Sequence, residues 1–142
     1  MKFLIVLLFC TVSLFGTSLT KSGDYVIDKE NKLMWQDTKD NVFKIVSHIT
    51  APEYCEKLTL GGFNNWRVPK VKEYELIIDK TRDIELKIDK AFKYTLPVGY
   101  WAKDRTWRTL GKWGYYVYFK SGAVYYENRT YPKLVRCVRD FK

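Results

Sequence analysis

The sequence predicts a single α+β domain, residues 19–142, that carries one disulfide. Apolar residues recur at helical spacing from Ala51 and again after Pro69. From Trp113 onward, apolar and polar residues alternate with the period of two that is typical of strands. Cys55 and Cys137 form an even pair of cysteines within this domain, as expected of a small exported protein.

The first residues predict a signal peptide over 1–18. Lys2 supplies the positive charge, residues 3–15 form an apolar run, and the small and polar residues 16–18 fit a cleavage site. This run is shorter than the roughly 20 residues that a membrane-spanning helix needs, and no later stretch is as apolar. We therefore expect a periplasmic or secreted protein with no transmembrane segment in its mature form.

The first predicted elements are a β-hairpin and a short helix. Two strands, Tyr25–Asp28 and Leu33–Trp35, flank a polar turn. The helix begins after Thr50, which we expect to cap it together with Glu53, and Gly61-Gly62 ends it. Its inward residues are predicted to be Ala51, Tyr54, Cys55 and Leu58.

A second short helix is predicted after Pro69. We expect Val71, Tyr74 and Ile77 or Ile78 on its buried side, and Lys72, Glu73 and Glu75 in water. The stretch from Asp79 to Lys93 alternates in charge, which is typical of a solvated helix or loop.

The last third predicts a hairpin and one further strand. The hairpin pairs residues 113–119 with 123–127 across the turn 120–122, and the final strand covers 134–139. Alternation places Tyr115, Val117 and Phe119 on one face of the hairpin and Tyr116, Tyr118 and Lys120 on the other. One of these faces must be exposed or must contact a partner.

The two cysteines of the domain favour a disulfide over a pair of metal-binding or redox thiols. They lack a C-x-x-C spacing and a nearby histidine. A bridge that closes a loop of about 80 residues would stabilise the fold by roughly 4 kcal/mol if loop-closure entropy dominates. It would also hold the first helix against the terminal sheet, because Cys137 shares a side of its strand with Val135 and Arg139.

Several of these segments together resemble a known family. They are Leu33-Met34-Trp35-Gln36, Gly61-Gly62, Asn64-Asn65-Trp66-Arg67-Val68-Pro69, and Val135-Arg136-Cys137-Val138-Arg139. In this order, they resemble the bacterial domain family found at the C-terminus of the Legionella collagen-like adhesin. The resemblance covers nearly all of residues 19–142.

The resemblance implies a fold like that of C-type lectins and formylglycine-generating enzymes, with two short helices flanking a twisted antiparallel sheet. It also implies adhesion through sulfated glycosaminoglycans, and it implies core roles for Trp66, Trp101 and Trp113. The sequence departs from the family at Lys70, where a capping threonine is common, and at Tyr100-Trp101-Ala102-Lys103, where a serine-rich segment is common. We expect the second departure to lie in a loop.

The residue types argue against catalysis and against a metal site. His48 is the only histidine, and its neighbour Ser47 in sequence is not oriented as a nucleophile needs to be. One histidine, two paired cysteines and scattered acids give no set of converging metal ligands. We therefore expect neither an enzyme nor a cofactor.

The basic excess favours binding of a polyanion. The net charge is +9, and its excess falls in the last third, where basic and aromatic residues alternate. Arginine matches sulfate and carboxylate geometry, and aromatic faces suit sugar rings. The predicted anion contacts are Lys103, Arg105, Arg108, Lys112, Arg129 and Lys133, with aromatic contacts from Trp107, Tyr116 and Tyr118. Arg67 and Arg136 have a structural alternative as buried partners.

Two classes of partner stay open at this point. An acidic or sulfated glycan fits the charge, whereas the tyrosine face of the hairpin fits a protein partner, either another envelope protein or a second copy of the chain. An anionic lipid surface would also attract the charge. A nucleic acid partner is not expected of an exported protein.

Overall fold

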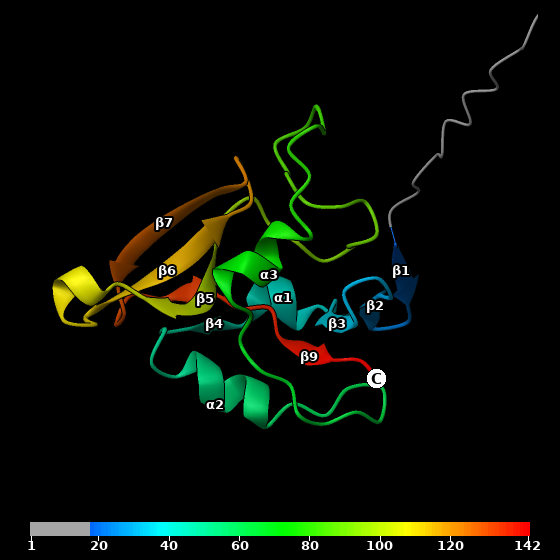
Figure 1. The fold of residues 1–142 in the computed structure, drawn as a ribbon, viewed down its shortest axis with the longest axis horizontal. Helices are drawn as coiled ribbons and strands as arrows, with labels where there is room; N and C mark the ends of the chain where they lie inside the picture. Colours follow the sequence, from blue (N-terminus) through cyan, green and yellow to red (C-terminus); the bar gives the residue numbers. More distant parts are fainter. Residues whose placement is uncertain (1–17) are drawn as a thin grey trace, which may run out of the picture.

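The computed structural model describes residues 18–142 and shows an α+β fold in which strands predominate (Figure 1). The predicted signal peptide lies outside these residues, apart from Ser18. None of the helices in the described part of the chain has the length and apolar character that crossing a membrane requires.

The first sheet has four antiparallel strands in the order β1-β2-β3-β9. The predicted hairpin is confirmed, with Val26 opposite Trp35. The carboxylate of Asp28 accepts hydrogen bonds from the backbone and side-chain amides of Asn31, at 3.0 and 2.9 Å, and so closes the turn. The strands are β1 (Leu19–Ser22), β2 (Tyr25–Asp28), β3 (Leu33–Gln36) and β9 (Val138–Asp140).

The second sheet has five strands in the order β4-β8-β5-β6-β7. Its C-terminal hairpin is the one predicted, with Tyr116 opposite Tyr125. All pairs are antiparallel except one parallel bridge between Tyr100 and Leu134. The strands are β4 (Ile45–Val46), β5 (Gly99–Arg105), β6 (Trp113–Tyr118), β7 (Ala123–Asn128) and β8 (Lys133–Leu134).

The prediction of one final strand over 134–139 was wrong. The chain leaves the second sheet at Leu134 and joins the first sheet at Val138. The three residues between the two strands, Val135, Arg136 and Cys137, are fully buried. This segment therefore joins the two sheets, a role that the alternation of its residues does not reveal.

The prediction of a loop at Tyr100–Lys103 was also wrong, because these residues belong to β5. Tyr100, Trp101 and Ala102 have no exposed surface. Both faces of the strand are covered at this point, so consecutive residues are apolar and the alternation that marks a half-exposed strand is missing.

The two predicted helices are present, but the first is capped differently from the prediction. They are α2 (Ala51–Glu56) and α3 (Val71–Glu75), and a short α1 (Asp40–Phe43) precedes them. Thr50 makes no capping bond to α2. Instead, the Ser47 hydroxyl accepts the Thr50 amide at 3.1 Å and the Thr50 hydroxyl accepts the Ser47 amide at 3.2 Å. Glu53 pairs with Lys57.

Glu73 was predicted to lie in water, and this was wrong. The Glu73 carboxylate accepts two hydrogen bonds of 2.7 Å from the Arg67 guanidinium and one of 2.8 Å from the Lys70 amide. Burial alone would raise the pKa of Glu73. The Arg67 and Lys70 donors lower this pKa by more than burial raises it, so it lies below its usual value. The structural role considered for Arg67 is confirmed, and Glu73 caps α3 despite the lysine at position 70.

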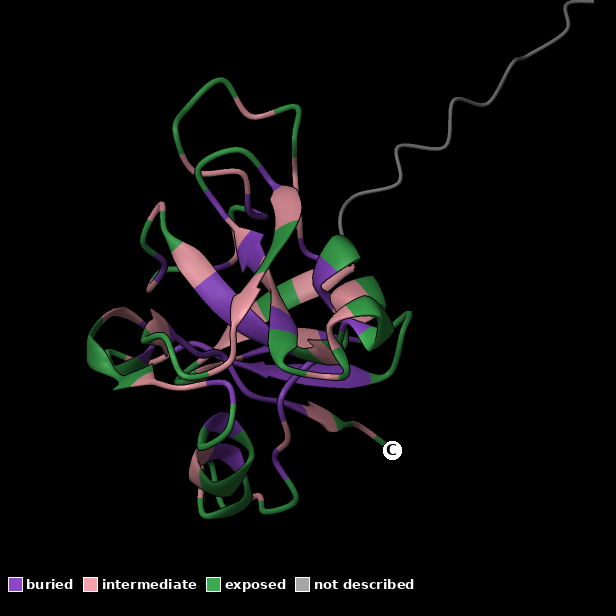
Figure 2. Cartoon of the chain, turned by 90° about the vertical axis from the view of Figure 1, so that its left-hand side faces the viewer, coloured by how far each residue is buried: buried purple, intermediate pink, exposed green. Residues whose placement is uncertain are grey.

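The main core lies between the two sheets, with α3 packed against it (Figure 2). Trp35 of β3 and Phe119, which directly follows β6, both contact the Tyr74 ring of α3, with ring centroids 5.7 and 5.9 Å from that of Tyr74. The stretch predicted to be solvated, residues 79–93, is a loop as expected, but Ile88, Asp89 and Phe92 are buried. Charge alternation concealed the two apolar residues that attach this loop to the core.

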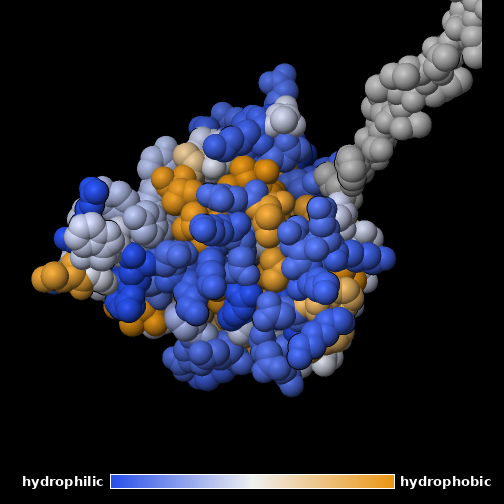
Figure 3. Space-filling model, viewed as in Figure 1, coloured by the Kyte–Doolittle hydropathy of each residue, from blue (hydrophilic) through white to orange (hydrophobic). Residues whose placement is uncertain are grey.

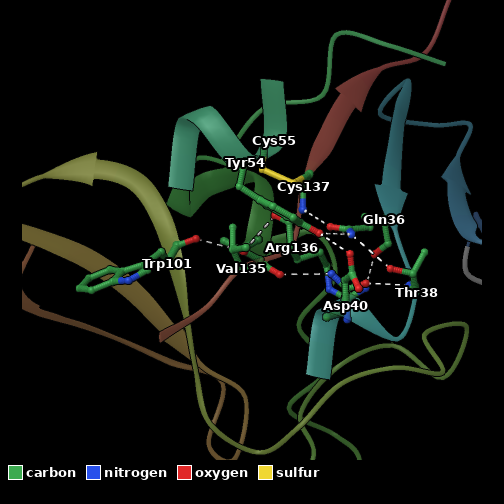
Figure 4. The surroundings of a disulfide bond; sticks show 11 residues. Gln36, Thr38, Asp40, Tyr54, Cys55, Trp101, Val135, Arg136 and Cys137 are labelled. Atoms are coloured by element: carbon green, nitrogen blue, oxygen red, sulfur yellow. Dashed lines mark hydrogen bonds between the residues drawn. A yellow bond between two sulfur atoms is a disulfide. The ribbon is translucent and has the colours of Figure 1, made fainter. Parts of the chain in front are cut away.

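The disulfide between Cys55 and Cys137 is confirmed, with Cα atoms 5.6 Å apart. It joins α2 to the segment that connects the two sheets (Figure 4). A second cluster of buried residues surrounds it, including Met34, Trp66 and Val68. The bridge thus holds α2 against the first sheet, whereas the prediction placed the helix against the sheet of the C-terminal hairpin.

Next to the disulfide, Arg136 forms a fully buried ion pair with Asp37. Its guanidinium also donates to the Gln36 and Tyr94 carbonyls and to the Thr95 hydroxyl. Burial raises the pKa of the Asp37 carboxyl, but Arg136, Lys21 and two backbone amides outweigh it and lower that pKa. The structural role considered for Arg136 is confirmed.

Replacing Arg136 with Met should lower the free energy of unfolding by about 3 kcal/mol, because Asp37 would lose its fully buried cation and keep only Lys21 and two backbone amides as partners. Urea denaturation followed by circular dichroism measures the loss. Adding Asp37→Asn to the same variant should cost less than the sum of the two single changes. A loss below about 1 kcal/mol for R136M would contradict the role assigned to the pair.

Candidate anion-binding site

One end of the second sheet carries most of the predicted anion contacts. Here β5 ends at Arg105, a short 3₁₀ helix η1 (Trp107–Thr109) forms the turn, and β6 begins at Trp113. In Figure 1 this turn is the yellow segment at the far left. We call residues 103–113 together with Arg129 the basic tip.

The structure brings three of the predicted anion contacts together around one hollow of about 400 Å³. Arg105 ends β5, Lys112 directly precedes β6 and Arg129 directly follows β7, and all three line the hollow. The other lining residues are Ile49, Leu110, Gly111, Asn128 and Thr130. Strand pairing explains the convergence, because Arg105 lies opposite Gly114 and Asn128 lies opposite Trp113.

His48 does not line the hollow, but it holds Arg129 in position. The Arg129 Nε–H donates to His48 Nδ1 at 3.0 Å, and the other ring nitrogen of His48 lies 3.2 Å from the Asp104 carbonyl oxygen. The ring occupies the space above Gly114, where a Cβ would come within 2.3 Å of His48 Cδ2. It also meets Trp101 edge to face, with ring centroids 5.2 Å apart.

The electrostatics of this arrangement favour a neutral histidine. Burial lowers the pKa of His48, and the positive charges of Arg129 and Arg105 lower it further. Burial and the nearby Arg105 guanidinium also lower the pKa of Arg129. A neutral His48 can accept the Arg129 hydrogen bond, whereas an imidazolium cannot. Both ring nitrogens of His48 thus have a hydrogen-bond partner.

None of the five basic side chains of the tip pairs with a carboxylate within residues 18–142. The nearest acid in sequence, Asp104, instead accepts the Val71 backbone amide at 2.7 Å. The five side chains are Lys103, Arg105, Arg108, Lys112 and Arg129. Positive charge at the tip is therefore not neutralised from within this part of the chain.

Arg108 and Lys103 lie near the hollow in sequence but do not line it. The Arg108 guanidinium lies over the ring of its neighbour Trp107, 5.6 Å from the centroid. Lys103 is exposed and its backbone amide donates to the Pro69 carbonyl at 2.7 Å.

Lys133 stands apart from the other predicted anion contacts. Its ammonium pairs with Glu127 and lies over the Tyr116 ring, 4.0 Å from the centroid. Only 14% of its side chain is exposed. Its charge is thus balanced within the sheet, and we do not include it in the candidate site.

The predicted aromatic contacts fall into two places. Trp107 is 82% exposed at the tip. Tyr116 and Tyr118 are half-buried on the outer face of the hairpin, where Tyr116 packs against Trp101 and Tyr125. Of the tryptophans assigned to the core, Trp66 and Trp101 are buried, but Trp113 is 38% exposed, so its core role was wrong.

His48, Ile49 and the polar pair Asn128 and Thr130 were missed by the sequence reasoning. Nothing local to His48 indicates Arg129 as its partner, because the two are 81 positions apart. The one usable signal is Gly114, a glycine inside a strand, which indicates that another group approaches the backbone closely.

Residues 18–142 hold no group of three or more histidine, cysteine or carboxylate side chains arranged to bind a metal ion. The chemistry that the hollow offers is instead that of fixed guanidinium and ammonium donors, which bind oxyanions.

Folding stability should depend on the protonation of His48. Its unfolded pKa is about 6.5 and its folded pKa is lower, so the unfolded chain binds the proton more tightly. The free energy of unfolding should be highest above about pH 6.5 and should fall as the pH drops toward the folded pKa.

Urea denaturation between about pH 7.5 and 5.5 would show this loss, since the chain has only one histidine. His48→Gln retains an acceptor for Arg129 but does not titrate, so its stability should change less over this range. Equal slopes for both proteins would refute the linkage.

Comparison with known proteins gives one finding. Residues 24–139 match the family described as the Lcl C-terminal domain. No curated protein and no solved structure matches the chain.

Proposed function

Because the chain belongs to the family of Lcl C-terminal domains, we propose that it is an exported, non-catalytic binding domain whose basic tip binds acidic or sulfated glycans. Family membership indicates an adhesin-like binding domain, and the choice of ligand rests on the basic tip. The match covers the second sheet, α2, α3, the whole tip, and the first sheet apart from β1 and the last residue of β9.

One observation carries this choice of ligand. Arg105, Lys112 and Arg129 surround a hollow and make no ion pair within the described residues. Elsewhere in the domain, arginines that lie close to carboxylates pair with them, as Arg67 and Arg136 do. Unpaired arginines that converge on one concave place can provide the forked donors that a sulfate or carboxylate group accepts.

The hollow is also prepared for binding. His48 holds the Arg129 guanidinium in place, and a further contact of 3.4 Å joins Arg129 to the Gly111 carbonyl oxygen. A side chain that is already ordered loses little conformational entropy when a ligand binds. A small anion contacting both Arg105 and Arg129 would also relieve the repulsion between them.

The aromatic residue of the tip suits a sugar. Trp107 exposes most of its side chain. It directly precedes Arg108 and lies three positions before Leu110, which lines the hollow. A saccharide whose acidic group enters the hollow could place a ring face against this indole. The lectin-like architecture implied by the resemblance is consistent with this role and remains a prediction.

A protein partner is the second candidate. The outer face of the hairpin exposes about half of Tyr125, which packs on Tyr116 and Tyr118. Aromatic surfaces of this kind favour protein contacts. The two candidates differ in their response to salt, since binding of a polyanion through the basic tip should weaken steeply and an aromatic contact should not.

Replacing Arg105 and Arg108 together with alanine should weaken binding to immobilised heparin by about tenfold or more, because each charge-assisted hydrogen bond contributes roughly 1.5–3 kcal/mol. Elution from heparin in a salt gradient, compared with elution from a sulfonate cation exchanger, measures the change. Both side chains are exposed, so the melting temperature should stay nearly constant.

The matched control removes two exposed charges far from the tip in sequence, Lys29→Ala and Lys90→Ala. This variant should lower the salt concentration at elution by the same amount on heparin and on the sulfonate exchanger. The proposal fails if the wild-type protein leaves heparin and the sulfonate exchanger at the same salt concentration, since only net charge would then be recognised.

A further inference from the structure

The basic tip ends in two apolar side chains that have almost no contact with the rest of the protein. Leu110 is 89% exposed and Trp107 is 82% exposed, the highest values among the large hydrophobic residues in the described part of the chain. An acidic glycan gains nothing from a fully exposed leucine. Binding of an acidic glycan therefore accounts for Trp107 at most and leaves the exposure of Leu110 unexplained.

The turn presents the two side chains together. Trp107 begins the 3₁₀ helix η1 and Leu110 follows its last residue, so the two are three positions apart. Both side chains are exposed, so this one turn carries two large apolar groups into solvent. Leu110 has a left-handed backbone (φ 52°), a conformation that is unfavourable for a leucine.

Hydrogen bonds hold the turn in this shape. The Leu110 amide donates to the Trp107 carbonyl at 3.1 Å, and the Gly111 amide donates to the Thr106 carbonyl at 3.1 Å. The turn is thus ordered, with its apolar side chains directed away from the core.

Positive charge surrounds this apolar point. In Figure 3 a hydrophobic group forms the far left end of the molecule, at the position of η1 in Figure 1, and hydrophilic residues, in blue, lie nearby on the same face. Arg108 lies within η1, and Arg105, Lys112 and Arg129 line the hollow that Leu110 borders.

We propose that the basic tip docks on a membrane surface with anionic headgroups. Trp107 and Leu110 enter the boundary between headgroups and acyl chains, and the arginines bind the headgroup anions. The inference rests on the proposed function, because the same hollow takes the anion, and it assigns that anion to a lipid-borne source such as an acidic glycolipid.

A membrane fits these observations better than a protein partner does. Two projecting side chains on one turn bury far less than the roughly 800 Å² per partner of a stable protein interface. A lipid surface needs no shaped pocket, and weak apolar insertion combined with basic residues is the pairing that holds peripheral proteins on anionic membranes. Tryptophan in particular favours the headgroup level.

Co-sedimentation of the mature domain with lipid vesicles tests the proposal. The probes are vesicles of phosphatidylcholine alone and vesicles in which part of it is replaced by phosphatidylglycerol. We expect binding to the anionic vesicles only, with the fluorescence of Trp107 shifted to shorter wavelength. Trp107→Phe should abolish most of that shift while largely retaining binding.

Leu110→Ser tests whether the tip inserts into the membrane. It should weaken binding to anionic vesicles by about tenfold, because one buried leucine side chain is lost. The control, Leu96→Ser, changes a leucine that is 40% exposed and lies outside the tip, and it should leave vesicle binding unchanged.

Two results would overturn the inference. If the wild-type protein is retained on heparin but ignores anionic vesicles, the polyanion is not lipid-borne and the proposed function stands. If vesicle binding is equal in L110S and wild type and shows no fluorescence shift, the contact is electrostatic only and no insertion occurs.

Discussion

The buried ion pair between Arg136 and Asp37 is the interaction on which the rest of the structure depends. It joins the end of β3, the segment that connects the two sheets, and the long loop of residues 76–98. Asp37 also accepts the Lys93 and Tyr94 amides at 2.9 Å each. Because the loop has no helix or strand of its own, these bonds and the burial of Ile88 and Phe92 determine its path.

The disulfide at Cys137, one residue after Arg136, fixes the segment that connects the two sheets to α2. Two sheets, a helix and a loop are therefore held at one short stretch of chain.

This arrangement leaves the other end of the second sheet free to carry function. The basic tip lies at the left of Figure 1, away from the disulfide, and its residues come from three neighbouring strand ends. The core therefore does not require the charge or the apolar side chains of the turn. Strand pairing brings Arg105 and Arg129 together. His48 then holds Arg129 next to the sheet by accepting a hydrogen bond from it.

The sequence predicted the elements whose residues show a clear period, and it failed where burial on both faces removes the period. The β6-β7 hairpin, α2, α3 and the disulfide are confirmed, since each has an alternation, a helical repeat or a paired cysteine. β5 was missed because Tyr100, Trp101 and Ala102 are consecutively buried, and Val135–Cys137 was misassigned for the same reason. Of the predicted anion contacts, Arg105, Lys112 and Arg129 converge, whereas Lys133 is neutralised by Glu127, six positions earlier in the chain.

Gly114 shows how closely the sheet and the tip are connected. It lies within β6, yet the absence of its side chain makes room for His48, and His48 in turn holds Arg129. Any side chain at this position would push the imidazole outward and leave the guanidinium without its acceptor. During divergence of the family, a change at this strand position would therefore reshape the hollow without changing any residue that lines it. Relatives that lack this glycine should have a reorganised tip, so the residue at position 114 is a simple marker for the geometry of the hollow.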